Sequence, residues 1–204
     1  MAISVATRRL SIALLFSAVI AAGVVHSDTA TFACNGCHGT YGISQANNIP
    51  TISGLNFQYF YATMQAFKRD ERKSTIMGRI AKGFRTRQLQ RLAMTYGRYR
   101  WSGNPLMAFD LGLAQRGKAI HEKNCIECHE QNGHFQDKDT PPLAGQAKGY
   151  LLNQMRDYRV AATIMPQPPI MQEQLEQLSD EDLIALAEFF SSPLAKPPTV
   201  SSER

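Results

Sequence analysis

The 204-residue sequence lacks three patterns that define large classes of protein. No stretch of four or more residues alternates apolar and polar side chains, so strands are not expected. Beyond residue 27, no apolar run approaches the length of a membrane-spanning helix. No glycine-rich turn follows a predicted strand, so the sequence has no fingerprint of a flavin or nicotinamide dinucleotide site. These absences favour an all-α protein whose chemistry depends on other residues.

Cysteine is also scarce, and its placement is the strongest signal in the chain. The four cysteines and the histidines that follow them form two copies of one motif: Cys34, Cys37 and His38, and Cys125, Cys128 and His129. This spacing is the attachment signature of a c-type haem. On one helical turn the three positions share a face, so both thiols can reach the vinyl groups of one porphyrin edge while the imidazole ligates the iron. The motifs therefore predict two covalently bound c-type haems.

Zinc and disulfide bonds are the alternatives for the four cysteines. The cysteine pairs of zinc ribbons usually lie about 15–20 residues apart, whereas these pairs begin 91 residues apart. Disulfide bonds would not explain why a histidine follows the second cysteine of each pair. A thioredoxin-like redox site would need a βαβ context, which the sequence does not contain.

The N-terminal segment, residues 1–27, has the pattern of a secretory signal peptide. Two adjacent arginines precede an apolar stretch, Leu10–Val25, which is short for a membrane span. Cleavage could follow Ser27 or Gly23, and an uncleaved anchor is the alternative. The prediction is a periplasmic protein, because that is the compartment in which bacteria attach c-type haem.

The remainder of the chain is an internal repeat, which predicts two domains. At an offset of 91 residues the first motif falls on the second, and Pro50–Gly54 falls on Pro141–Gly145. At an offset of 94 residues, four residues match four later ones: Leu89, Leu92, Ala93 and Tyr96 match Leu183, Leu186, Ala187 and Phe190. We expect domains at 28–104 and 105–204, each a small helical fold around one haem.

Helical periodicity predicts similar elements in both halves. Helices are expected at 55–69, 87–96, 112–123, 146–159 and 180–191. Ser179 and Asp182 have the spacing of an N-terminal cap for the last of these. Few residues precede the first motif, so the helix before it is expected to be truncated or absent. Residues 97–111 are expected to link the domains, and the tail from Pro193 is expected to be extended.

Each haem iron needs a sixth ligand or an open position. A methionine thioether suits an electron carrier, because it favours ferrous iron and raises the reduction potential. In the first half Met77 lies in a predicted loop, whereas Met64 and Met94 lie in predicted helices and are expected in the core. We therefore predict Met77 as the ligand of the first haem.

In the second half Met165 and Met171 flank a proline-rich loop. Met171 precedes Leu183 by twelve residues, just as Met77 precedes Leu89. The repeat register therefore selects Met171 as the ligand of the second haem and leaves Met165 as the alternative.

Two other histidines follow the signal segment, His121 and His134, and both are expected at the surface; a bis-histidine haem using one of them is the alternative. A ligating imidazole usually donates its second N–H to a carbonyl or carboxylate. Pro50 and Pro141 each lie twelve residues after a motif histidine. Their carbonyls are candidate acceptors, unless these prolines only set a turn.

Charge is divided unevenly between the halves. Residues 28–104 hold eleven Lys and Arg against three Asp and Glu, whereas residues 105–204 hold nine against fourteen. This asymmetry would dock one half on the other or present a steering surface to a partner. A solvated basic face without a partner is the alternative.

The two motifs with their methionines resemble the diheme c-type cytochromes built from two tandem class I cytochrome c domains. More narrowly, the segment Ser74–Gly83 around Met77 is similar to the ligand loop of the cytochrome subunit of flavocytochrome c sulfide dehydrogenase. Leu143–Gln146, Tyr150–Leu151 and the two methionines of the second half also fit that subunit. The prolines between those two methionines depart from it.

The resemblance implies a division of labour. A separate flavoprotein subunit carrying FAD would oxidise sulfide by two electrons, and this chain would accept them singly and pass them to a soluble cytochrome or an oxidase. The chain by itself would not be an enzyme, and no nucleic acid would be involved. A free-standing periplasmic diheme carrier to a terminal oxidase is the alternative. A haem peroxidase would need an open sixth position, which a methionine at both sites disfavours.

Overall fold

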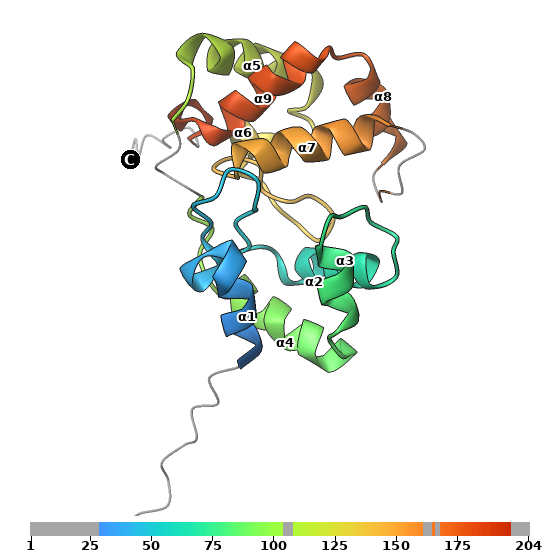
Figure 1. The fold of residues 1–204 in the computed structure, drawn as a ribbon. Coiled ribbons are helices and arrows are strands. Elements are labelled where there is room, and N and C mark those ends of the chain that lie inside the picture. The colour runs from blue at the N-terminus through green and yellow to red at the C-terminus, as the bar shows by residue number, and fades with distance from the viewer. Residues whose placement is uncertain (1–28, 104–107, 161–164, 166–167, 197–204) are drawn as a thin grey trace, which may run out of the picture.

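The computed structural model describes residues 29–103, 108–160, 165 and 168–196, and every regular element in this part of the chain is a helix, as predicted. The first half contains α1 (Thr29–His38), the 3₁₀ helix η1 (Thr40–Gly42), α2 (Phe57–Lys68), α3 (Met77–Lys82) and α4 (Thr86–Gly97). The second half contains α5 (Leu111–Asn124), α6 (Glu130–Gly133), α7 (Lys148–Arg159), α8 (Pro169–Glu176), α9 (Asp180–Ser191) and the 3₁₀ helix η2 (Pro193–Ala195). Figure 1 shows the two groups of helices stacked on each other.

Four predictions fall in part or whole outside these residues, one of them the C-terminal tail, of which 197–204 is not described. The signal peptide, residues 1–27, and the proposed boundary between 104 and 105 are not described. Of the linker, 104–107 is not described. Among the helices that are described, none has both the length and the apolar character needed to cross a membrane.

The five predicted helices correspond to α2, α4, α5, α7 and α9. The last begins with the expected cap, in which Ser179 Oγ accepts from the Asp182 N–H at 3.2 Å and Asp182 Oδ2 accepts from the Ser179 N–H at 3.0 Å. These reciprocal bonds satisfy N–H groups that have no partner within the helix.

The helix before the first motif is truncated, as expected, since only residues 29–33 of α1 precede Cys34, whereas the whole of α5 precedes the second motif. Local structure differs from the prediction at two other places. Two segments predicted as loops are helices, α3 and α8, and they carry Met77 and Met171. The first residues of the C-terminal tail are not extended, because η2 turns back and buries Ala195 against the second core; the rest of that prediction, residues 197–204, lies outside the described residues.

Each half has its own hydrophobic core. The four residue pairs matched at an offset of 94 are all buried, with relative exposures between 0% and 2%. Leu89, Leu92, Ala93 and Tyr96 belong to the first core, and Leu183, Leu186, Ala187 and Phe190 to the second. Burying one apolar face of every helix against its own half stabilises the two halves separately.

The second half is built around a close crossing of α5 and α9. Gly117 permits this approach, because a Cβ there would lie 2.0 Å from the backbone oxygen of Ala185 on α9. One turn later, His121 is fully buried and its ring centre lies 5.3 Å from those of Phe189 and Phe190. The prediction that His121 lies at the surface was therefore wrong, because α9 covers this position and no local pattern indicates that contact.

The two halves are joined by hydrogen bonds between their equivalent proline–glycine loops. Gln146 accepts from the Thr51 N–H through Oε1 at 2.8 Å and donates from Nε2 to the Thr51 oxygen at 3.0 Å. Gln136 makes a similar pair of bonds to the backbone of the first half. Trp101 of the linker donates to the Ala144 oxygen at 2.8 Å. Buried bonds of this kind hold the halves in one orientation.

Candidate haem-binding sites

The first site is carried by the last turn of α1. His38 is buried, and its Nδ1 lies 2.7 Å from the Pro50 oxygen. This is one of the two carbonyl contacts that the sequence predicted. With Nδ1–H donating to the carbonyl, the lone pair of Nε2 is left for a metal. Burial lowers the pKa of His38, although the bond to Pro50 opposes this shift, so the imidazole is neutral and able to ligate at neutral pH.

Other core residues support the first motif. The Tyr96 hydroxyl donates to Asn35 Oδ1 at 2.9 Å and contacts Cys34, which packs against the first core. Met77 is partly buried against the same core, at the first residue of α3. The Gly78 N–H donates to Ser74 Oγ at 2.8 Å and fixes the start of that helix.

The other two methionines of the first half differ in how far they are buried. Met64 is buried, as expected of a core residue. Met94 is 61% exposed, so its assignment to the core was wrong; it lies on the outer side of α4, opposite the buried Leu89, Leu92 and Ala93.

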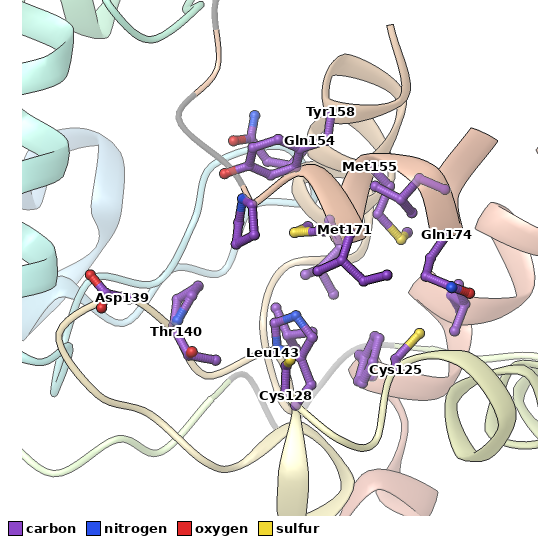
Figure 2. A pocket seen from close by; sticks show the side chains of 18 of the residues that line it. Cys125, Cys128, Asp139, Thr140, Leu143, Gln154, Met155, Tyr158, Met171 and Gln174 are labelled. Atoms are coloured by element: carbon purple, nitrogen blue, oxygen red, sulfur yellow. The ribbon is translucent and has the colours of Figure 1, made fainter. Parts of the chain in front are cut away.

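The second site is a cavity of about 880 Å³, a size typical of cofactor sites. Cys125, Cys128 and His129 line it, and so does Met171 of α8. Figure 2 shows Cys125, Cys128 and Met171 along the walls of this one space. The structure thus brings together the four residues that the sequence assigned to the second haem.

The sixth-ligand alternatives lie elsewhere. Met165 is buried but is not among the described residues that line the cavity. His121 and His134 do not line it either, and His134 is half-buried rather than exposed. Of these alternatives, the geometry therefore favours Met171. This residue reaches the cavity because α8 places it on the wall that faces the motif.

His129 differs from its counterpart in the first half. It is buried, and its Nδ1 has no hydrogen-bond partner in the described part of the chain. The candidate bond to the Pro141 carbonyl is not formed, so here the alternative holds that the proline only sets a turn, although Pro141 lines the same cavity. The physical reason is that α5 ends at Asn124, so the second motif lies in turns beyond the helix, whereas His38 completes α1. Burial and the nearby His121 lower the pKa of His129 to about 4, so its ring is also neutral.

The wall of the second cavity includes residues of the first half, which sequence reasoning missed. Tyr59 and Arg72 line it beside Tyr150, Gln154 and Tyr158 of α7. At the repeat offset of 91 residues Tyr59 also falls on Tyr150. That match is the one signal in the sequence, and it carries no information about contact between the halves.

A c-type haem fits this cavity. Its lining offers two thiols, a neutral imidazole with an unsatisfied nitrogen and a thioether, and no disulfide forms among the cysteines of the described chain. These donors match covalent attachment and axial ligation of iron. A bound haem supplies a one-electron ferric–ferrous couple, while the chain's residues attach it, orient it and exclude water.

Comparison with known proteins agrees with this geometry. Residues 114–192 match the family model for cytochrome c. The chain is 25% identical over 175 residues, 81% of each chain, to the thiosulfate dehydrogenase electron acceptor of Stutzerimonas stutzeri. A shorter match, 39% identical over 67 residues, covers 33% of this chain and 60% of the cytochrome subunit of sulfide dehydrogenase of Chlorobaculum tepidum. The structure of cytochrome c4 of Acidithiobacillus ferrooxidans has a TM-score of 0.69 at 23% identity, covering 78% of this chain and 98% of that one.

The fold and the motifs therefore define a cytochrome c domain in the second half and a diheme, cytochrome c4-like arrangement of the two halves. The chain carries two covalently bound c-type haems. The chain as a whole is similar to cytochrome c4 and to the thiosulfate dehydrogenase electron acceptor, and its two haems suit the transfer of single electrons.

Proposed function

We propose that this carrier is the periplasmic electron acceptor of a dehydrogenase that oxidises an inorganic sulfur compound. In this proposal the first haem receives electrons one at a time, the second haem receives them from the first, and a soluble cytochrome or an oxidase takes them away. The observation that carries the proposal is the run of exposed basic residues along α3 and α4, the segment that begins with Met77.

That surface has the chemistry of a docking site. From residue 76 to residue 97 the sequence contains no Asp or Glu. Five basic residues of this stretch are exposed: Arg79, Lys82, Arg85, Arg87 and Arg91. Ile76 and Met94 of the same stretch are also exposed, by 53% and 61%. Exposed basic and apolar residues suit an acidic partner, because the charges steer association and the apolar residues stabilise contact.

Contact between the two halves neutralises few of their opposite charges. In the described residues one ion pair crosses between the halves, Lys73 with Asp157 at 2.6 Å. The acidic start of α9 is paired within its own half, where Asp182 binds Arg116 and Asp180 binds Arg156 and Arg159. Lys82 pairs with the exposed Asp70 of its own half at 2.7 Å. No ion pair of the described residues includes Arg79, Arg85, Arg87 or Arg91, so these four remain available to another protein.

Two donors of this class are the candidates. A sulfide-oxidising flavoprotein is favoured by the Met77 loop and by the 39% identical match, which covers a third of the chain. A thiosulfate dehydrogenase is favoured by the relative that matches 81% of the chain. A free-standing carrier to a terminal oxidase is the remaining candidate, supported by the likeness to cytochrome c4.

The test is stopped-flow reduction of the purified two-haem protein by each dehydrogenase with its own substrate. Reversing two charges with Arg79→Glu and Lys82→Glu should slow reduction by the true donor about tenfold at low salt, with less effect at high salt. Both haem spectra should stay unchanged. The matched control is Lys118→Glu with Lys196→Glu, which makes the same charge change in the second half, at the half-buried Lys118 and the exposed Lys196.

The outcomes separate the candidates. Fast reduction by the flavoprotein or by the thiosulfate enzyme identifies the donor. Equal rates for the two double variants would place docking elsewhere, and failure of both dehydrogenases with prompt transfer to an oxidase would leave the free-standing carrier. Cell fractionation tests the periplasmic location independently.

A further inference from the structure

Arg72 follows α2 in the first half and is almost fully buried, with 5% exposure. Its Nη2 donates to Gln154 Oε1 of α7 at 2.6 Å, across the junction of the two halves. Its guanidinium carbon lies 5.5 Å from the ring centre of Phe67 and 5.8 Å from that of Tyr158. Its Nε is buried and has no hydrogen-bond partner in the described part of the chain.

A buried guanidinium needs a negative partner. Removing a cation from water costs several kcal/mol unless an anion and hydrogen bonds compensate. Among the ion pairs of the described residues, none joins Arg72 to a carboxylate; its neighbour Glu71 is exposed and pairs with Arg69 at 2.7 Å. The Gln154 amide and the aromatic rings offer only dipoles.

The surrounding tyrosines do not supply the missing charge. Tyr59, Tyr150 and Tyr158 interact with Arg72. Burial raises the pKa of Tyr150 to about 12, although Arg72 opposes the shift, and burial also raises the pKa of Tyr158. Both phenols are therefore neutral at physiological pH.

The missing anion has an obvious source in the cavity that Arg72 lines. That cavity also holds Cys125, Cys128 and His129, so it takes the second haem. A c-type haem carries two propionate carboxylates on the edge away from its thioether bonds. Arginine binds carboxylates with paired, charge-assisted hydrogen bonds, and its Nε–H is one of the donors used.

We propose that Arg72, a residue of the first half, binds a propionate of the second haem and completes that haem's site. The guanidinium neutralises the carboxylate in a dry environment and adds positive potential near the iron. Both effects favour ferrous over ferric iron and keep the propionate ionised, so reduction of this haem takes up one electron without a proton. The inference concerns haem binding and does not depend on which dehydrogenase is the donor.

The experiment is redox titration of the intact two-haem protein, followed by visible spectroscopy from pH 5 to pH 8. Proton NMR contacts between each porphyrin and the core side chains of its half assign the two haems. Arg72→Gln removes the charge but keeps a polar side chain. At pH 7 and fixed applied potential, it should raise the ferric-to-ferrous ratio of the second haem about tenfold, with little change at the first haem.

Arg72→Gln should also make the second haem's potential depend on pH. A propionate without its cation has a raised pKa, so reduction then takes up one electron and, in part, one proton. Arg72→Lys, which restores a cation with a single point of contact, should recover much of the wild-type ratio. Resonance Raman bands of the propionate should shift in both variants.

The matched control is Lys73→Gln, which removes the neighbouring positive charge and an ion pair between the halves. Lys73 is exposed and does not line the cavity, so the ratio should change less than about twofold. Equal shifts in Arg72→Gln and Lys73→Gln, or no shift in either, would overturn the proposal. If Arg72→Gln fails to accumulate with two haems, the pH dependence and Raman bands of Arg72→Lys decide: wild-type values in both would refute the assignment.

Discussion

The two haem sites share their covalent chemistry but differ in what holds the proximal imidazole. His38 is the last residue of a helix and is oriented by the Pro50 carbonyl of its own half. His129 lies in turns beyond α5, and its Nδ1 has no partner in the described chain. The cavity around it is closed by Tyr59 and Arg72 of the other half. Duplication has preserved the attachment motif, while the environment of the second haem has become dependent on the first half.

The largest effect is expected when one haem attachment site is removed at a time, which tests whether the two sites are independent. Cys34→Ala with Cys37→Ala should remove one haem, and Cys125→Ala with Cys128→Ala should remove the other, because each pair forms the two thioether bonds of its own porphyrin. Mass spectrometry after acid–acetone extraction should find two retained haems in the wild type and one in each variant. Loss of both haems from the wild type under extraction would contradict covalent attachment.

Exchange of the sixth ligand should give the next largest effect. Met171→Leu should abolish the far-red sulfur-to-iron band of the second haem and lower its potential, because a soft ligand that favours ferrous iron is lost. Met77→His should lower the potential of the first haem for the same reason. Met165→Leu is the control, and loss of the second band in that variant, but not in Met171→Leu, would show that the register argument is wrong.

The α5–α9 crossing should make the stability of the second half sensitive to a methyl group added at Gly117. Gly117→Ala places a Cβ against the Ala185 oxygen and should destabilise this half by about 3 kcal/mol, an overpacking cost. Gly112→Ala lies on the same helix, where the nearest atom is Asp110 Oδ1 at 3.4 Å, and should be nearly neutral. Thermal unfolding, followed by absorbance at the Soret band, measures the stability of both variants. Equal losses of stability would mean that α5 and α9 can move apart at little cost.

His121 should give the smallest effect, and one that depends on pH. Burial lowers its pKa, with Glu122 opposing, so the folded protein keeps this ring neutral. Above the unfolded pKa of about 6.5 the ring is neutral in both states and contributes no pH dependence. As the pH falls below that value, His121 binds a proton in the unfolded chain but not in the folded chain. Folding stability therefore decreases until the pH reaches the lowered pKa of His121 in the folded protein. His121→Phe should therefore gain stability over the wild type at pH 5 relative to pH 8, as measured by denaturant unfolding. A constant difference across this range would show that His121 titrates normally.

Much of the architecture could be predicted from local patterns. The motif spacing defines the haem attachment sites, since i, i+3 and i+4 positions share a helix face. The repeat offset placed four buried pairs in two cores, because residues in equivalent positions of duplicated folds pack in equivalent ways. Helical periodicity and the Ser179 cap located the long helices, since both are properties of neighbouring residues.

Contacts between distant segments could not be predicted from the sequence. The burial of His121 depends on α9, some 60 residues later, and the exposure of Met94 depends on which side of α4 the core occupies. Arg72 looked like one more surface charge in a basic segment, yet it is enclosed by α7 of the other half. No periodicity records such a contact, because it arises from the docking of two separately folded cores. The sequence alone therefore determined that there are two haems, whereas the tertiary structure determined that the first half lines the site of the second.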